Sequence, residues 1–204
     1  MEHLELIYAL VLFGAFFALW KGKQYLQKQS TGHDPEVFLR SQDPLQRFLF
    51  YFFVLLRVSG GALIVAHGVG LENVWGFQRL SVLESEIYNH IGFGIGVVGL
   101  MICLIAQYTM GASWRVGIDQ ERPSELVIRG IFRMVRNPTY LGLLLLVAGL
   151  WIIWPTPAST AYFLLIFFFI EVLVRGEESY LEGLHGKKYL DYKSHTQRYL
   201  PLIY

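Results

Sequence analysis

Charged side chains are scarce in this sequence. Asp, Glu, Lys and Arg make up 16% of its 204 residues, against about 25% in typical soluble domains. A soluble fold must cover itself with polar side chains, whereas a chain surrounded by lipid need not. The single cysteine, Cys103, excludes a disulfide scaffold, and a hydrophobic content of 54% excludes a disordered chain. The formal net charge of +1 gives no general attraction for nucleic acid. We therefore predict an integral membrane protein with one membrane domain, residues 1–204.

The apolar residues are concentrated in five long runs that carry almost no charge. A spanning helix needs about 20 residues, with about 17 as the lower limit. Backbone polar groups in lipid must be paired within the segment, which predicts helices. Runs such as 163–169 are apolar on every side and do not fit the alternating pattern of a barrel strand. The prediction is an all-α membrane fold with transmembrane helices at 4–20, 48–67, 91–108, 140–154 and 158–174.

The last two predicted spans are separated only by Pro155, Thr156 and Pro157. The first of them would rise only about 22 Å, which is short of the thickness of the hydrocarbon core. We therefore expect a short helical hairpin over 140–174 whose tip lies near or just below the outer interface. Because this hairpin stands between segments 109–139 and 175–204, it would bring their ends together and create room for a cofactor-binding region.

Basic residues predict the orientation of the chain. Fifteen of the seventeen lie in segments 21–47, 109–139 and 175–204, and the connections on the other side hold Arg79 alone. This asymmetry predicts the N-terminus outside and the C-terminus in the cytoplasm. The N-terminal stretch is not expected to be a cleavable signal peptide, because it carries Glu2 and Glu5 instead of a basic region.

Two conspicuous features favour structural interpretations. Residues 92–99 contain a GxGxxG pattern, but no strand is predicted before it, so Gly92 and Gly96 are expected to allow close helix packing. That packing could lie within one chain or between chains, and the oligomeric state stays open. Arg57 lies in the middle of a predicted span and is either functional or a structural arginine that caps helix carbonyls; we favour the second. The histidine spacing does not indicate a metal site, and none is expected.

If the last span continues as a helix to His185, its side chains divide into two faces. The first face is polar and is expected to be solvated or self-paired; it holds Glu171, Arg175, Glu178, Glu182 and His185. The second face is apolar apart from Glu177. That carboxylate either pairs with an arginine for structural reasons or meets a cation in a partly dry site.

Segment 109–139 supplies residues that could face Glu177. Pro138 suits the first turn of a helix with Asn137 as its N-cap. The backbone donors at this helix start, with Arg133 and Arg136, could form an anion site or could be simple capping.

Residues 136–142, the pair Glu177-Glu178, residues 186–192 and Pro201 occur in an order that resembles the isoprenylcysteine carboxyl methyltransferase family. This family is similar to the phospholipid N-methyltransferases. The resemblance covers residues 107–201. Residues 114–119 look like the version in bacterial members, so the bacterial inner membrane is the expected location.

The resemblance implies an S-adenosylmethionine site. Matched to the family's motifs, it comprises Ser124, Glu125, Leu126, Val127, Phe132, Arg136, Asn137, Pro138, Thr139, Tyr140 and Glu177. Family members commonly have histidine at the position of Asn137. The arginine that contacts the substrate in eukaryotic members is replaced here by Leu173.

The implied activity is methyl transfer to a lipophilic acceptor from the membrane, with carboxyl O-methylation of an isoprenylcysteine-like substrate as the leading hypothesis. Arg133 and Arg175 are candidate clamps for an acceptor carboxylate, and Glu178 is a further candidate catalytic residue. An amine acceptor would need a base, for which Glu177, Glu178 or Tyr140 are candidates. The alternatives are a phospholipid or lipid-amine N-methyltransferase, a membrane reductase of similar design that uses a nicotinamide cofactor, and a non-enzymatic membrane scaffold.

Overall fold

The structure, a computed structural model, describes residues 2–38, 43–83, 85–119, 122–123 and 125–199. The α-helices of this part of the chain are α1 (Glu2–Thr31), α2 (Pro44–Gly68), α3 (Glu86–Met110), α4 (Pro138–Ile153), α5 (Pro157–His185) and α6 (Lys187–His195). Short 3-10 turns are η1 (Leu71–Asn73), η2 (Ser81–Leu83), η3 (Gly111–Ser113) and η4 (Gly130–Arg133). The described residues contain no strand, so the all-α prediction is confirmed.

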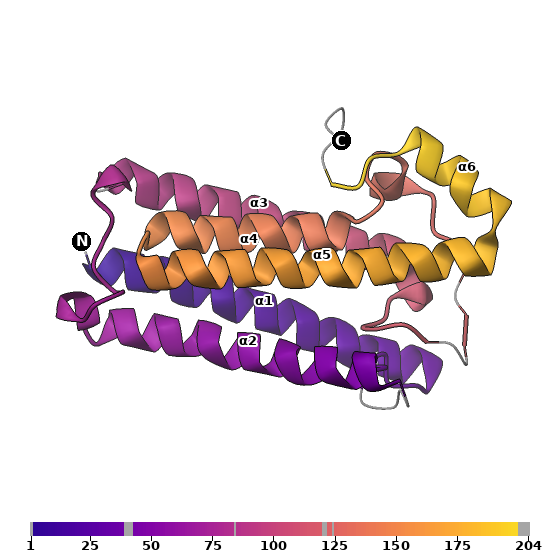
Figure 1. The fold of residues 1–204 in the computed structure, drawn as a ribbon, viewed down its shortest axis with the longest axis horizontal. Helices are drawn as coiled ribbons and strands as arrows, with labels where there is room; N and C mark the ends of the chain where they lie inside the picture. The colour runs from indigo at the N-terminus through magenta and orange to yellow at the C-terminus, as the bar shows by residue number, and fades with distance from the viewer. Residues whose placement is uncertain (1, 39–42, 84, 120–121, 124, 200–204) are drawn as a thin grey trace.

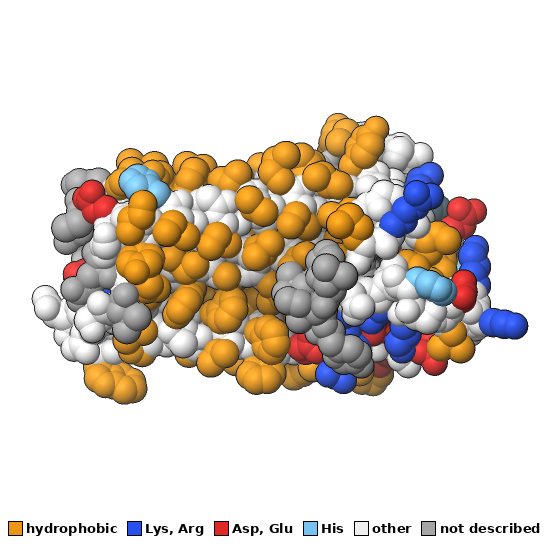
Figure 2. Space-filling model, turned by 90° about the horizontal axis from the view of Figure 1, so that it is seen from above, with side chains coloured by type: hydrophobic (Ala, Val, Ile, Leu, Met, Phe, Trp, Pro, Cys, Tyr) orange, Lys and Arg blue, Asp and Glu red, His pale blue; other side chains and the backbone are white. Residues whose placement is uncertain are grey.

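Helices α1 to α5 run side by side and form one elongated bundle (Figure 1). Four of them are long and apolar enough to cross a membrane, and α4 is a shorter apolar helix. Residues 111–137, α6 and the segment after it lie together at one end of the bundle, which we call the charged end. Residues 69–85 and the α4–α5 turn lie at the other end, which we call the distal end. In Figure 2 apolar side chains cover the middle of the bundle, while Lys and Arg gather at the charged end.

The first helix extends beyond the apolar run that predicted it. The expected span ended at residue 20, whereas α1 continues to Thr31, so the assignment of 21–31 to a loop was wrong. Gln27 explains the extension, because its buried amide donates hydrogen bonds to the carbonyls of Ala112 and Trp114, each at 2.7 Å. Contacts with the segment after α3 therefore stabilise the polar end of α1. A hydropathy profile of the sequence contains no information about such contacts.

The predicted hairpin is present, since only Trp154–Thr156 separate α4 from α5. Thr156 and Ser159 form a reciprocal capping box. The Thr156 hydroxyl accepts from the Ser159 backbone N–H at 3.1 Å, and the Ser159 hydroxyl accepts from the Thr156 N–H at 2.9 Å. Pro157 occupies the first turn of α5. These residues start the second helix at once and keep the two helices antiparallel.

Glycines bring α3 and α4 into close contact. A Cβ added to Gly99 would lie 2.5 Å from the Gly142 carbonyl oxygen, and one added to Gly92 would lie 2.7 Å from that of Gly149. No larger side chain fits between the two backbones. The glycine pattern therefore packs helices within this chain, and Gly92 and Gly96 lie inside α3 rather than in a nucleotide-binding loop.

A buried polar cluster joins the elements of the distal end. Glu5 of α1 is 2% exposed and accepts hydrogen bonds from Arg79 (2.7 Å), Asn89 (2.7 Å) and the Trp154 indole (2.9 Å). We call Glu5, Arg79, Asn89 and Trp154 the distal clamp. It joins α1, the α2–α3 connection, α3 and the end of α4 through one carboxylate.

Arg57 does not belong to that cluster. Its guanidinium carbon lies 4.4 Å from the centre of the Phe53 ring, and the side chain lines an apolar cavity among α1, α2, α4 and α5. The expected capping of helix carbonyls by Arg57 is not among the hydrogen bonds of the described residues.

Candidate active site

The charged end is held together by hydrogen bonds between segments that are far apart in the sequence. The backbone N–H groups of Arg136 and Asn137 donate to the carbonyls of Gln197 (2.8 Å) and Arg198 (3.1 Å). The Tyr192 hydroxyl of α6 donates to the Phe132 carbonyl at 2.7 Å. Burial raises the pKa of Tyr192 to about 12, which keeps this donor protonated at neutral pH. The chain after α6 is thereby fixed against the start of α4.

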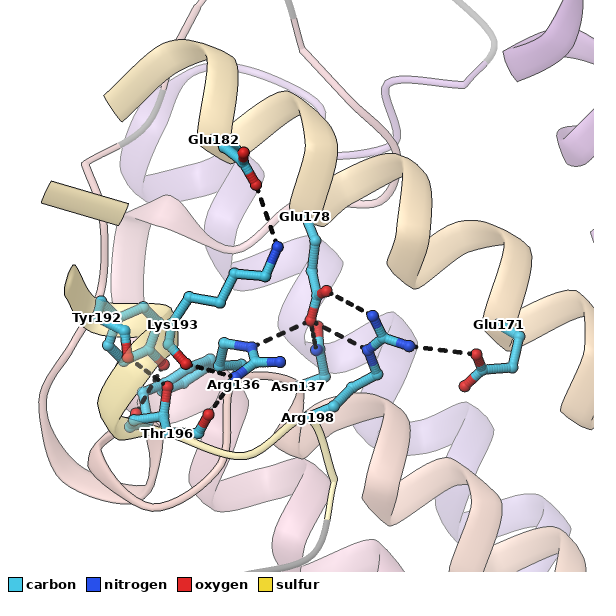
Figure 3. Close-up of polar contacts among 10 residues, drawn as sticks. Arg136, Asn137, Glu171, Glu178, Glu182, Tyr192, Lys193, Thr196 and Arg198 are labelled. Carbon is cyan, nitrogen blue, oxygen red and sulfur yellow. Dashed lines mark hydrogen bonds and ion pairs between the residues drawn. The ribbon is translucent and has the colours of Figure 1, made fainter. Parts of the chain in front are cut away.

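Glu178 is the centre of this arrangement (Figure 3). It is 4% exposed, and its two oxygens accept from Arg136 Nε (3.2 Å), Asn137 Nδ2 (3.0 Å) and Arg198 Nη2 (2.8 Å). We call Glu178, Arg136, Asn137 and Arg198 the Glu178 clamp. The hydrogen bond and charge of Glu178 raise the pKa of Arg198. The clamp connects α5, the start of α4 and the segment after α6.

One prediction about this region was wrong. Glu178 was placed on a solvated or self-paired face of α5, but the segment after α6 covers it and supplies Arg198 as a partner. The N-cap position predicted for Asn137 is confirmed, although its side chain donates to Glu178 and makes no capping bond. The N–H groups of Arg136 and Asn137, which precede the helix, donate to carbonyls, and the anion site at the helix start stays a prediction.

Glu177 has quite different surroundings from its neighbour. It is half-buried, and the Tyr140 hydroxyl donates to its Oε2 at 3.1 Å. The positive charge of Arg115 attracts it as well. Unlike Glu178, Glu177 lines two cavities, so its carboxylate is available to a ligand. The helical projection placed Glu177 on the apolar face of this helix, and in the structure Glu177 forms part of the wall of both pockets.

The first cavity, which we call the cap pocket, lies among the 113–137 segment, the end of α5 and α6. Its lining mixes charged, aromatic and aliphatic side chains, including Glu125, Leu126, Val127, Tyr180 and Tyr189. Because it combines hydrogen-bonding groups with apolar surface, this pocket suits a polar molecule of moderate size.

The second cavity, the bundle pocket, lies between the helices and is mainly apolar. Its lining includes Phe16, Trp20, Leu143, Ile166 and Phe169, from α1, α4 and α5. The two pockets adjoin and share a wall, which is formed by Met110, Arg115, Gly117, Phe132, Arg136, Asn137 and Glu177; we call this shared wall the junction. An amphipathic molecule could keep its chain in the bundle pocket and its polar group at this junction.

The structure brings most of the predicted cofactor residues together at these pockets. The cap pocket is lined by Glu125, Leu126 and Val127, the bundle pocket by Pro138, Thr139 and Tyr140, and both by Phe132, Arg136, Asn137 and Glu177. Ser124 lies outside the described residues.

The predicted catalytic residues are not all brought to the pockets. Arg133 and Arg175 are exposed and line neither the cap pocket nor the bundle pocket. The Arg175 side chain is 69% exposed, and its Nε lies 3.4 Å from Glu171 one helical turn away. Glu178 is held in the Glu178 clamp and also lines neither of these two pockets.

Sequence reasoning used Arg115 as one of the basic residues that orient the chain and as part of the stretch 114–119, but gave it no role in the site, yet Arg115 lines both pockets. Its position depends on backbone pairing of Val116 with the segment after α1. The Val116 N–H donates to the Pro35 carbonyl at 3.0 Å, and the Val37 N–H donates to the Val116 carbonyl at 2.9 Å. Residues 35–37 are distant in the sequence, so no local pattern pointed to Arg115.

Comparisons of sequence and of fold both find similarity to methyltransferases. The phospholipid methyltransferase family model matches residues 88–188, which include most of α3, all of α4 and α5, and most of the residues that line the two pockets. A probable protein-S-isoprenylcysteine O-methyltransferase from Oryza sativa subsp. indica is 28% identical over 123 residues, 59% of this chain. The protein-S-isoprenylcysteine O-methyltransferase of Saccharomyces cerevisiae is 26% identical over 124 residues, again 59% of this chain. Over its C-terminal part the chain is therefore similar both to the phospholipid methyltransferase family and to proteins named as isoprenylcysteine O-methyltransferases.

The fold is similar to that of a solved methyltransferase structure. The structure of a eukaryotic intramembrane Ras methyltransferase, ICMT, superposes with a TM-score of 0.58 at 20% sequence identity. It covers 96% of this chain and 68% of that one. With its apolar helices and this fold, the chain is a multi-pass integral membrane protein. It spans less than two thirds of the curated relatives, since the matched segments make up 64% of the rice protein and 52% of the yeast protein.

Proposed function

We propose that this chain transfers a methyl group from S-adenosylmethionine to the carboxylate of a lipophilic, isoprenylcysteine-like acceptor. The observation that carries the proposal is the junction of a mixed-polarity pocket with an apolar pocket at one under-partnered carboxylate, Glu177. A methyl donor is polar, and a lipid acceptor is not. Two adjoining cavities of different character can hold both at once. The relatives named for isoprenylcysteine O-methylation support the acceptor class.

The residues of the cap pocket fit the cofactor. S-adenosylmethionine carries a sulfonium, an ammonium, a carboxylate and a flat adenine ring. Glu177 would attract the positive groups, because its two oxygens accept only one hydrogen bond, from Tyr140, in the described part of the chain. Leu126, Val127 and Tyr180 offer apolar surface for a ring. When bound, the cofactor supplies a methyl group on a positively charged sulfur.

The protein's own contribution is position and exclusion of water. The bundle pocket would hold the acceptor chain between helices, so that its head group reaches the junction. Phe132 and Met110 line both pockets and restrict water there. Tyr140 holds Glu177 through its hydroxyl at 3.1 Å, and the Glu178 clamp fixes the wall behind it. A carboxylate acceptor is already ionised, so the chain needs no base, and alignment supplies most of the catalysis.

The distribution of basic residues supports an orientation for this machinery. We propose that the charged end faces the cytoplasm, with the N-terminus outside, because the basic segments gather at that end. The cofactor would then reach the cap pocket from the cytosol and the acceptor would reach the bundle pocket from the inner leaflet. The bacterial inner membrane is the proposed location.

The proposal is tested with the purified protein in detergent. We expect methyl-labelled S-adenosylmethionine to label N-acetyl-S-farnesylcysteine, and S-adenosylhomocysteine to bind in calorimetry while nicotinamide nucleotides do not. Glu177→Gln should reduce cofactor affinity at least tenfold, because one charge-assisted interaction is worth about 1.5–3 kcal/mol.

Glu182→Gln is the matched control, because Glu182 lies on the same helix but pairs with Lys193 and lines neither pocket. Labelling of phosphatidylethanolamine in place of the prenylcysteine would indicate a lipid-amine N-methyltransferase. Nicotinamide binding would indicate a reductase. If neither cofactor binds, the non-enzymatic membrane scaffold is the interpretation that remains.

A further inference from the structure

Arg115 has the position of a ligand-binding cation rather than a structural one. It lines both pockets at their junction with Glu177. In the described part of the chain its one hydrogen bond is from Nη1 to the Arg122 carbonyl, at 2.8 Å. Its guanidinium carbon lies 5.9 Å from the centre of the Tyr180 ring. A guanidinium has five N–H donors, so several remain available to a carboxylate.

The other arginines near the junction cannot take this role without breaking the fold. Arg136 also lines both pockets, but its Nε donates to Glu178, and its Nη1 donates to the carbonyls of Lys193 and Thr196. Arg198 is held by Glu178 as well. Arg133 and Arg175 line neither pocket. Leu173 lines the bundle pocket and has no charge to offer.

We propose that Arg115 binds the carboxylate of the methyl acceptor and thereby makes this site selective for anionic lipophilic acceptors. This inference rests on the proposed function. The resulting order of charges alternates: Glu177, the sulfonium, the acceptor carboxylate and Arg115. Without Arg115, two carboxylates would face each other across a partly dry junction and would repel.

Arg115 acts by position. The acceptor oxygen forms a bond to the methyl carbon while the carbon–sulfur bond breaks, and the electron pair of that bond stays on sulfur. No proton moves. A fork of N–H donors can hold one carboxylate oxygen and leave the other directed at the methyl carbon. The same cation disfavours a protonated lipid amine, so Arg115 would separate O-methylation from N-methylation.

The test compares a carboxylate ligand with its uncharged analogue. The probes are N-acetyl-S-farnesylcysteine and its carboxamide, measured by calorimetry on the purified protein saturated with S-adenosylhomocysteine, so that no turnover occurs. The wild type should bind the carboxylate at least tenfold more tightly than the carboxamide. Arg115→Gln should reduce this preference to less than threefold, and Arg115→Lys should keep part of it. In turnover assays Arg115→Gln should raise the KM for the acceptor about tenfold.

The affinity for S-adenosylhomocysteine should stay within threefold of the wild-type value in both variants, which also shows that they are folded. Arg129→Gln is the matched control, because Arg129 is exposed and lines neither pocket. Retention of the carboxylate preference in Arg115→Gln, with wild-type methyl transfer intact, would overturn the inference alone. An equal loss of S-adenosylhomocysteine affinity would assign Arg115 to the cofactor instead. If the wild type neither binds S-adenosylhomocysteine nor transfers a methyl group, the proposed function fails and the inference fails with it.

Discussion

Glu177 and Glu178 are neighbours in α5, but their surroundings differ completely. Glu178 accepts hydrogen bonds from three side chains that belong to the start of α4 and the segment after α6. Within the described residues, Glu177 accepts one hydrogen bond, from Tyr140, and it lines both pockets. A carboxylate whose oxygens are fully used holds segments together. One with acceptor positions left over can bind a cationic ligand.

The distal end repeats the first of these two patterns. Glu5 accepts from Arg79, Asn89 and Trp154 and joins four parts of the chain, much as Glu178 does at the charged end. The bundle therefore has a buried, fully paired carboxylate at each end and an under-partnered one beside the pockets. This comparison predicts that two carboxylates matter for stability and that Glu177 matters for binding.

The largest expected effect on stability is that of Glu178→Ala. Removing Glu178 leaves Arg136 and Arg198 without their anion, so we expect the free energy of unfolding to fall by about 3–5 kcal/mol. Thermal unfolding in detergent measures this, with Glu182→Gln as the exposed control on the same helix. A melting temperature equal to that of wild type would show that the Glu178 clamp does not hold the charged end.

Glu5→Gln should have a smaller effect at the distal end. The amide keeps an acceptor oxygen but loses the charge, and Arg79 can recover some hydration because its side chain is 25% exposed. We expect a loss of about 1.5–3 kcal/mol in the free energy of unfolding. The affinity for S-adenosylhomocysteine should stay within twofold of wild type, since the distal clamp lies at the other end of the bundle (Figure 1). A large loss of that affinity would contradict the separation of the two ends.

Arg175→Gln should have the smallest effect. Its side chain is 69% exposed and Glu171 keeps Arg198 as a second partner, so we expect less than about 0.5 kcal/mol in the free energy of unfolding. The preference for a carboxylate over a carboxamide ligand should also be unchanged, because Arg175 lines neither pocket. Loss of that preference would move the acceptor clamp from Arg115 to Arg175.

Several of these features could be predicted from local patterns. The apolar runs predicted the spans, Pro155–Pro157 predicted the tight turn, and Gly92 and Gly96 predicted close packing that lies against α4. The helical projection separated Glu177 from the polar face of α5, and Glu177 lines the pockets. Each of these depends on residues close together in the chain, where periodicity and hydropathy carry the information.

Contacts between distant segments could not be predicted in this way. A projection of α5 alone assigns Glu178 to solvent, because it contains no sign that residues 196–199 return to cover that face. Arg115 was overlooked for the same reason, since its position depends on the pairing of Val116 with Pro35 and Val37.

The sequence by itself determined the all-α membrane architecture, the short hairpin and the identity of Glu177 as an acid on an apolar face. The lipid environment imposes these features directly, because every spanning segment must pair its backbone N–H and C=O groups by internal hydrogen bonds and can contain few charged side chains. Only the tertiary structure decided which of two adjacent carboxylates is paired and which arginine reaches the pockets. Those outcomes depend on partners supplied by distant segments, and a buried charge takes its role from the groups around it.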